Sequence, residues 1–235
     1  MSTRGLVLVF LVALAAMLAL LVPLRVAMDA TGPVAPGLSA RGVTGPVWSG
    51  RLQGAELDRR PLGDVTVALA PLPLLAGVQR VHVAGAGVSA DLLRGRRSGL
   101  ARADGRVELD DLATLPGLVV LLRLEDAGLQ FAEGRCARAE GRVAVEVGIA
   151  GAGGSVRLHG PMRCDGDHGV LALASSPGAG HHQAQATLEL RADGSYRLRS
   201  LVRPGDAATA LALQAAGFRQ TPAGLARTDS GHLLH

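Results

Sequence analysis

The sequence RVAVEVGI, at residues 142–149, gives the clearest evidence for the fold of this chain. Apolar side chains occupy every second position of this stretch, and small or charged residues stand between them. A period of two places alternate side chains on opposite faces of a β-strand. The same alternation occurs at residues 65–69, 81–83, 107–109, 184–190 and 196–202. We therefore expect antiparallel strands that each have one apolar face and one solvated face.

A glycine precedes several of these alternating stretches, in the repeated pattern Gly-x-apolar-x-apolar. The pattern occurs at unequal intervals, at residues 63–67, 105–109, 141–145, 154–158 and 194–198. Unequal intervals exclude a solenoid of fixed repeat length, so we interpret each glycine as a turn residue that precedes a strand. Because only 2% of the residues are aromatic, the core must consist mainly of Val, Leu and Ala in thin layers. The predicted fold class is mainly β, a meandering, mostly antiparallel, curved sheet.

One short helix is predicted near the C-terminus, in the sequence AATALALQAAG. Asp206 precedes it and can cap its first turn, and Gly217 can terminate it. After this helix, residues 218–225 and 227–234 indicate a final hairpin or a ragged end.

Residues 5–24, GLVLVFLVALAAMLALLVPL, differ from the rest of the chain because they contain no charged side chain. A helix of this length covers roughly 30 Å, the thickness of the hydrocarbon core of a bilayer. A cleaved signal peptide is the alternative, but its apolar core is shorter and ends at a small-x-small site, which VAMDATGP does not provide. We therefore expect residues 1–25 to be a single-pass transmembrane anchor, residues 26–39 a juxtamembrane linker, and residues 40–235 the β-rich domain.

The two cysteines, Cys136 and Cys164, lie on either side of two predicted strands. A hairpin that folds back would bring both cysteines to the same end of the sheet, where a disulfide is feasible. Two free thiols in a cytoplasmic protein are the alternative. Because an N-terminal anchor makes export plausible, we predict a structural disulfide and a domain located in the periplasm of a bacterium, with the short N-terminus inside the cell.

The composition and the motifs argue against an enzyme or a nucleic-acid-binding protein. The formal net charge is +4, but acidic residues follow the arginines closely and few aromatic side chains are available for base stacking. The sequence has no phosphate-binding loop and no nucleophile–base pair. The spacing of Asp165, Asp167 and His168 is more typical of a polar turn than of a metal site. We therefore predict no catalytic, cofactor or metal site.

Two features allow more than one interpretation. Trp48 could stack on a ligand or partner, although a lone Trp beside a strand is more often part of the core or the cover of a sheet edge. Arg94, Arg96 and Arg97 could bind acidic lipid headgroups or an acidic partner. A solvated loop is the simpler interpretation of this arginine cluster.

Several motifs along the chain occur together in one known family. The first is Leu-x-x-x-Gly-Val-x-Gly-x-Val-Trp-x-Gly at residues 38–50, in which Gly45, Trp48 and Gly50 are a candidate interaction or core motif. It is followed by a proline-leucine turn at residues 71–75, the two cysteines, a strand with Leu188, Leu190, Gly194 and Tyr196, and a terminal helix with Leu213 and Gly217. With its N-terminal apolar segment, the chain resembles protein N of the bacterial type II secretion system, an inner-membrane accessory component.

The resemblance implies a β-rich periplasmic domain without catalytic residues and a role in exporting folded proteins through the outer membrane. The predicted function is therefore that of a scaffold, held in the lipid of the inner membrane by residues 5–24, that contacts other type II secretion subunits through sheet edges or an apolar face. The alternative is a lipid-binding or lipid-transfer protein, because an open groove lined by Val, Leu and Ala could hold acyl chains.

Overall fold

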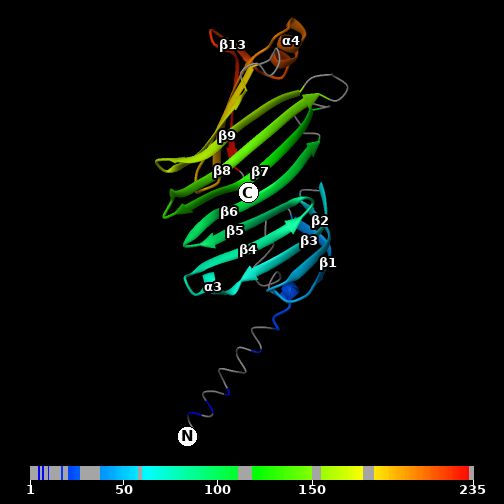
Figure 1. Ribbon diagram of the computed structural model, residues 1–235, viewed down its shortest axis with the longest axis vertical. Coiled ribbons are helices and arrows are strands. Elements are labelled where there is room, and N and C mark those ends of the chain that lie inside the picture. The colour runs from blue at the N-terminus through cyan, green and yellow to red at the C-terminus, as the bar shows by residue number, and fades with distance from the viewer. Residues whose placement is uncertain are drawn as a thin grey trace. The chain divides into compact units, whose positions relative to one another are not determined.

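The computed structural model describes residues 38–57, 60–110, 118–149, 155–176 and 183–232, together with residues 5, 7, 10, 17 and 21–26. The chain divides into two compact units, residues 1–86 and residues 87–235. In both units, antiparallel strands follow one another in chain order, except at the C-terminus (Figure 1).

The first unit is an antiparallel meander with a small apolar core. Its strands are β1 (Leu38–Thr44), β2 (Gly50–Leu57), β3 (Arg60–Ala70) and β4 (Val78–Gly85), and the single-turn helix α3 (Pro71–Leu74) connects β3 to β4. The buried core cluster consists of Leu24, Val47, Leu52, Ala55, Val65 and Val67. Two alternate positions of the predicted strand at residues 65–69 therefore lie in this core.

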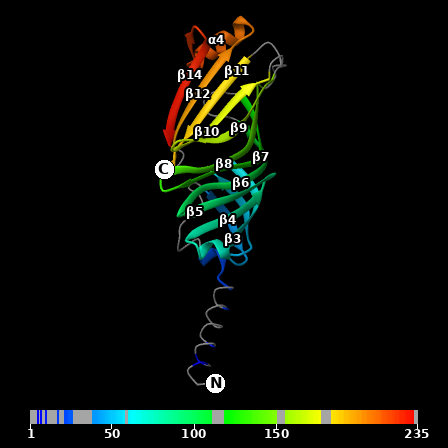
Figure 2. The same cartoon turned by 60° about the vertical axis from the view of Figure 1, so that its left-hand side comes forward.

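The second unit continues the same architecture with longer strands. The strands are β5 (Val88–Gly95), β6 (Arg97–Asp110), β7 (Leu118–Ala132), β8 (Arg135–Ile149), β9 (Ser155–Asp165), β10 (His168–Ser175), β11 (Gln183–Leu190), β12 (Ser195–Arg203), β13 (Arg219–Thr221) and β14 (Gly224–His232). They pair in chain order, except that β14 lies between β12 and β13. The helix α4 (Ala207–Ala215) connects β12 to β13 (Figure 2). The predicted antiparallel meander and the short C-terminal helix are confirmed.

The glycines of the repeated pattern have a different role from the predicted one. Gly63, Gly105 and Gly141 have φ values of 73°, 134° and 84°, and they lie inside β3, β6 and β8. Each lies at a register shift with a neighbouring strand, so each marks a β-bulge that bends a long strand. The prediction of a turn before a strand was therefore wrong for these three. Only Gly194 occupies a turn, between β11 and β12, and residue 154 lies outside the described residues.

Among the described residues, no helix is long and apolar enough to cross a membrane. Most of the predicted anchor, residues 5–24, and of the predicted linker, residues 26–39, lies outside the described part of the chain. Both therefore stay predictions. β1 begins at Leu38, two residues before the predicted start of the β-rich domain at residue 40.

Candidate functional site

Cys136 and Cys164 are joined by a disulfide, as predicted, with their Cα atoms 5.6 Å apart. Cys136 lies at the start of β8 and Cys164 near the end of β9, so the β8–β9 hairpin brings both to one end of the sheet. The bridge closes a sequence separation of 28 residues and ties the β7–β8 turn to the β9–β10 turn.

Replacing both cysteines by serine (C136S/C164S) should lower the free energy of unfolding by about 3–4 kcal/mol, because the reduced unfolded chain regains the entropy that a loop of this length restricts. Denaturant unfolding of the oxidised wild type and the double variant measures the difference. Reductant should destabilise the wild type by a similar amount and leave the variant unchanged. Equal stability of the oxidised wild type and the variant would show that the bridge has no structural role.

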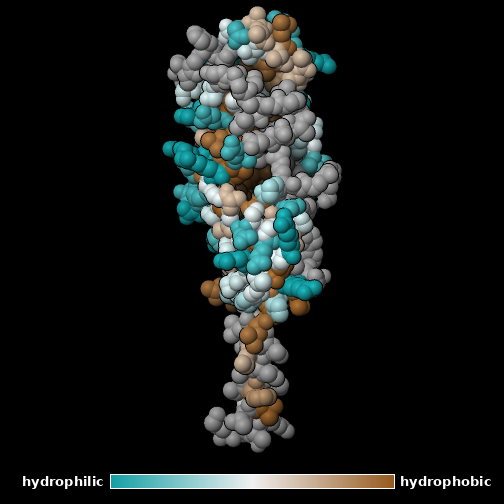
Figure 3. Space-filling view, turned by 90° about the vertical axis from the view of Figure 1, so that its right-hand side faces the viewer, coloured by the Kyte–Doolittle hydropathy of each residue, from teal (hydrophilic) through white to brown (hydrophobic). Residues whose placement is uncertain are grey.

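The second unit presents a continuous face of apolar side chains, here called the apolar face. Strand register aligns Val107, Leu122, Val145 and Leu158 across β6 to β9, and it aligns Leu171, Leu188 and Leu198 across β10 to β12. All of them except Leu158 are only half-buried. In the space-filling view, apolar surface lies between polar side chains in the part of the molecule that contains these strands (Figure 3).

The apolar face is concave between β7 and β10. These strands are separated by β8 and β9, which would place them about 14 Å apart in a flat sheet. Leu129 of β7 nevertheless contacts Gly169 of β10, and its side chain occupies the space that a Cβ atom at Gly169 would need. A leucine cannot reach across three strand spacings unless the sheet curls. The predicted curvature is therefore present in this unit.

The opposite face of these strands is polar and carries ion pairs. Arg157 donates from Nη2 to Oε2 of Glu146 at 2.9 Å, and the Ser155 hydroxyl donates to Oε1 at 2.8 Å. These hydrogen bonds, that of Arg157 first, hold the pKa of Glu146 below its usual value. Arg199 and Glu189 form a further ion pair at 3.1 Å. Alternation therefore separates an apolar face from a solvated, charged face, as the sequence predicts.

In the first unit, Leu24 packs against the candidate motif at Gly45, Trp48 and Gly50. We call these three residues the Leu24 seat. The Leu24 N–H donates to the Gly45 carbonyl at 3.0 Å, and the Leu24 side chain is only 3% exposed. A Cβ atom on Gly50 would collide with the Leu24 side chain, so the glycine leaves the space that Leu24 fills. Trp48 packs half-buried against the same core cluster. The motif therefore holds the C-terminal end of the apolar segment on the sheet.

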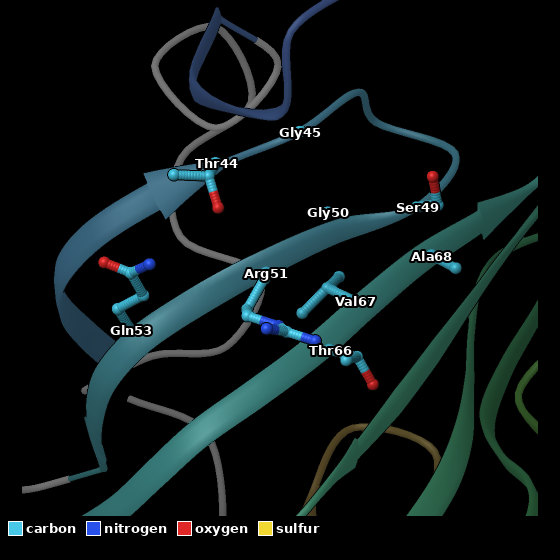
Figure 4. A pocket seen from close by; sticks show the side chains of 9 residues that line it. All are labelled: Thr44, Gly45, Ser49, Gly50, Arg51, Gln53, Thr66, Val67 and Ala68. Carbon is cyan, nitrogen blue, oxygen red and sulfur yellow. The ribbon is translucent and has the colours of Figure 1, made fainter.

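A shallow pocket of about 390 Å³ opens beside this seat (Figure 4). It is lined by Thr44, Gly45, Ser49, Gly50, Arg51, Gln53, Thr66, Val67 and Ala68. Among the described residues that line it, Arg51 alone is charged, and it is exposed. The lining side chains include hydroxyl, amide and guanidinium groups, but most of the accessible surface of the pocket is apolar.

The other residues of the predicted motifs cap a helix, form turns or pack against neighbouring strands in the second unit. Asp206 caps α4 by accepting the Thr209 N–H at 2.7 Å, as predicted. Gly217 follows the helix with φ 89°, and Phe218 N–H donates to the Leu213 carbonyl at 3.0 Å. Gly194 forms the turn before β12, and the ring of Tyr196 lies against Gly231. Arg94, Arg96 and Arg97 are exposed around the β5–β6 turn.

The seat of Leu24 was missed by the sequence analysis. Leu24 belongs to an uninterrupted apolar run, and nothing in its local sequence distinguishes a residue that packs in the domain from one that faces lipid. The glycines at positions 45 and 50 were the available signal, since a conformation at φ 87° and a side-chain-free position next to a buried residue both require glycine.

Comparison with protein families gives a match, whereas two other comparisons do not. A search of curated proteins and a search of solved structures found no match. Comparison with protein families matches residues 36–227 to the type II secretion system (T2SS) protein N. The matched region begins just before β1 and ends within β14, so it includes Gly45, Trp48 and Gly50 between β1 and the start of β2, the disulfide and α4, but not Leu24 itself. The chain belongs to the type II secretion system protein N family.

Proposed function

We propose that the protein is an inner-membrane scaffold of the type II secretion machinery, which acts by contact and not by catalysis. Membership of the protein N family makes it an accessory component of type II secretion and implies interaction with other secretion components. The observation that carries the proposal is the extent of the match, residues 36–227, which covers nearly all of the β-rich part.

The two ends of the strand order offer surfaces for such contacts. β1 has β2 as its partner in the first unit, and its other edge is not paired within the described strands. In the second unit β13 pairs only with residues 224–226 of β14, which leaves the remainder of that edge of β14 without a strand partner among the described residues. An exposed edge can accept a strand of another protein by β-augmentation.

We place the protein in the inner membrane with its β-rich domain in the periplasm. Val22 and Leu24 are held by the first unit, but the uncharged residues 5–21 that precede them still have the minimum length of a membrane-spanning helix. The Cys136–Cys164 disulfide suits an oxidising compartment such as the periplasm. Residues 1–25 would then hold the scaffold at the membrane.

Co-purification tests the scaffold role. The full chain, carrying a C-terminal affinity tag, is recovered from membranes of its host in mild detergent, and an unrelated single-span inner-membrane protein with the same tag serves as control. We expect other type II secretion subunits to be enriched with this chain and not with the control. Absence of every secretion subunit would contradict the proposal.

Lipid binding by the apolar face is a second candidate function. The half-buried residues Val107, Leu122, Val145, Leu171 and Leu188 support it, because a concave apolar surface of this kind can hold acyl chains. The face would then carry lipid in the periplasm.

Native mass spectrometry of the full chain tests lipid binding with a matched pair of variants. Val145→Glu places a charge on the apolar face, whereas Ala144→Glu places the same charge on the opposite face, where Ala144 pairs with Arg123 and His159. If the apolar face binds lipid, V145E should lose the co-purified lipid and A144E should keep it. Equal lipid content in both variants would exclude the apolar face as the binding site.

A further inference from the structure

The connection between β3 and β4 exposes two leucines to an unusual degree. Leu72, within α3, is 77% exposed, and Leu75, at the end of the same turn, is 88% exposed. They are the two most exposed large hydrophobic side chains among the described residues. The turn, PLPLL at residues 71–75, has no charged residue. Its prolines restrict the backbone, so the leucines are displayed on a stiff support.

Two successive backbone hydrogen bonds place this turn close to the end of the N-terminal apolar segment. Val47 N–H donates to the Val22 carbonyl at 2.9 Å, and Leu69 N–H donates to the Val47 carbonyl at 3.0 Å. Neighbouring extended segments lie about 4.8 Å apart, so Val22 and Leu69 are separated by roughly 10 Å. α3 begins two residues after Leu69. Figure 1 shows α3 and the short helical turn at residues 24–26 at the same end of the first unit.

The Leu24 seat makes this placement fixed rather than fluctuating. Leu24 is 3% exposed, its N–H is hydrogen-bonded to Gly45, and its side chain fills the space beside Gly50. The end of the apolar segment is therefore held on the sheet, close to the residues of β3 that precede α3. Because Val22 and Leu24 belong to the domain, the membrane would contain the segment only up to about residue 21, and it would then lie beside the end of the first unit that carries α3.

We propose that Leu72 and Leu75 insert into the interfacial layer of the membrane, beside the segment that anchors the chain. The inference rests on the membrane anchoring proposed above. Arg25 and Val26 are both exposed at the same end, with Val26 56% exposed. Leucine side chains suit the acyl boundary of the bilayer, and an arginine beside them suits its phosphate groups.

A lipid surface fits this turn better than a protein partner does. Stable protein interfaces bury about 800 Å² on each partner, and two leucines with Val26 supply only a small part of such an area. The lipid, in contrast, is brought to the turn by the chain itself. Insertion of α3 would fix the orientation of the first unit at the membrane surface.

Photo-crosslinking of the full chain in native membranes tests the proposal. A benzophenone amino acid is placed at position 72 or 75, and at position 61 as the control. Pro61 is exposed and lies on the same strand β3, about 33 Å from Pro71. We expect at least about fivefold more lipid adduct at positions 72 and 75 than at position 61, since only the turn reaches the bilayer.

Alkaline extraction of the same membranes separates failure of this inference from failure of membrane anchoring. If the chain resists extraction but positions 72 and 75 give no more lipid adduct than position 61, the insertion of α3 is wrong and the anchor stands. Adducts to another protein at positions 72 and 75, in place of lipid, would also overturn the insertion and assign the turn to a subunit contact. If alkali releases the chain, the anchoring and the insertion both fall.

Discussion

Replacing Leu24 by alanine is expected to destabilise the first unit by about 2–5 kcal/mol. Leu24 is almost fully buried in the core cluster, and its removal would leave a cavity beside Gly50 that the surrounding backbone cannot close. Trp48 is the only tryptophan of the chain and packs against this cluster, so its fluorescence reports unfolding of this unit. Denaturant unfolding of the full chain in detergent gives the measurement.

Leu21→Ala is the matched control for this substitution. Leu21 lies three residues earlier in the same apolar run but is 64% exposed in the structure. Its replacement should change the free energy of unfolding by less than about 0.5 kcal/mol. If L24A and L21A lower the free energy of unfolding reported by Trp48 fluorescence equally, Leu24 is not part of the domain core. The membrane would then have no fixed position beside α3.

Replacing Gly141 by alanine should destabilise the second unit by about 2–5 kcal/mol, because two costs add. A residue with a side chain is strained at φ 84°, which costs about 1–2 kcal/mol. The added Cβ would also collide with the backbone of Glu125 and Asp126 across the bulge, and overpacking of this kind costs about 1–3 kcal/mol. Far-UV circular dichroism during denaturant unfolding measures the loss.

Gly134→Ala separates the two costs. Gly134 has a similar φ of 76°, but a Cβ atom there would have no heavy atom within 4 Å. G134A should therefore show only the conformational strain, about 1–2 kcal/mol. Equal effects of G141A and G134A would mean that the backbone at the β7–β8 bulge moves aside, and that the bulge is not a fixed bend.

The strands could be predicted from the sequence because alternation depends only on local order. Val143, Val145 and Val147 occupy one face of β8 since a strand has a period of two, whatever its neighbours are. The disulfide was predictable for a similar reason, since a hairpin between Cys136 and Cys164 brings its own two ends together.

The bulges and the Leu24 seat depend on contacts between distant residues. A glycine at positive φ occurs both in a turn and in a bulge, and only the pairing of Gly141 opposite residues 125–128 shows which one is present. Leu24 meets Gly45 and Gly50 across more than twenty residues, and its apolar neighbours give no sign of this contact. The exposure of Leu72 and Leu75 likewise follows from the placement of α3 and not from its composition.

Secretion by the host bacterium tests the central claim, that this chain supports type II export as a membrane-held scaffold. The coding sequence is deleted, and the full chain is restored from a plasmid as the control. We expect type II substrates to accumulate in the periplasm of the deletion strain and to return to the medium on complementation, with proteins of other export routes unaffected. Unchanged export of all type II substrates by the deletion strain would contradict the account.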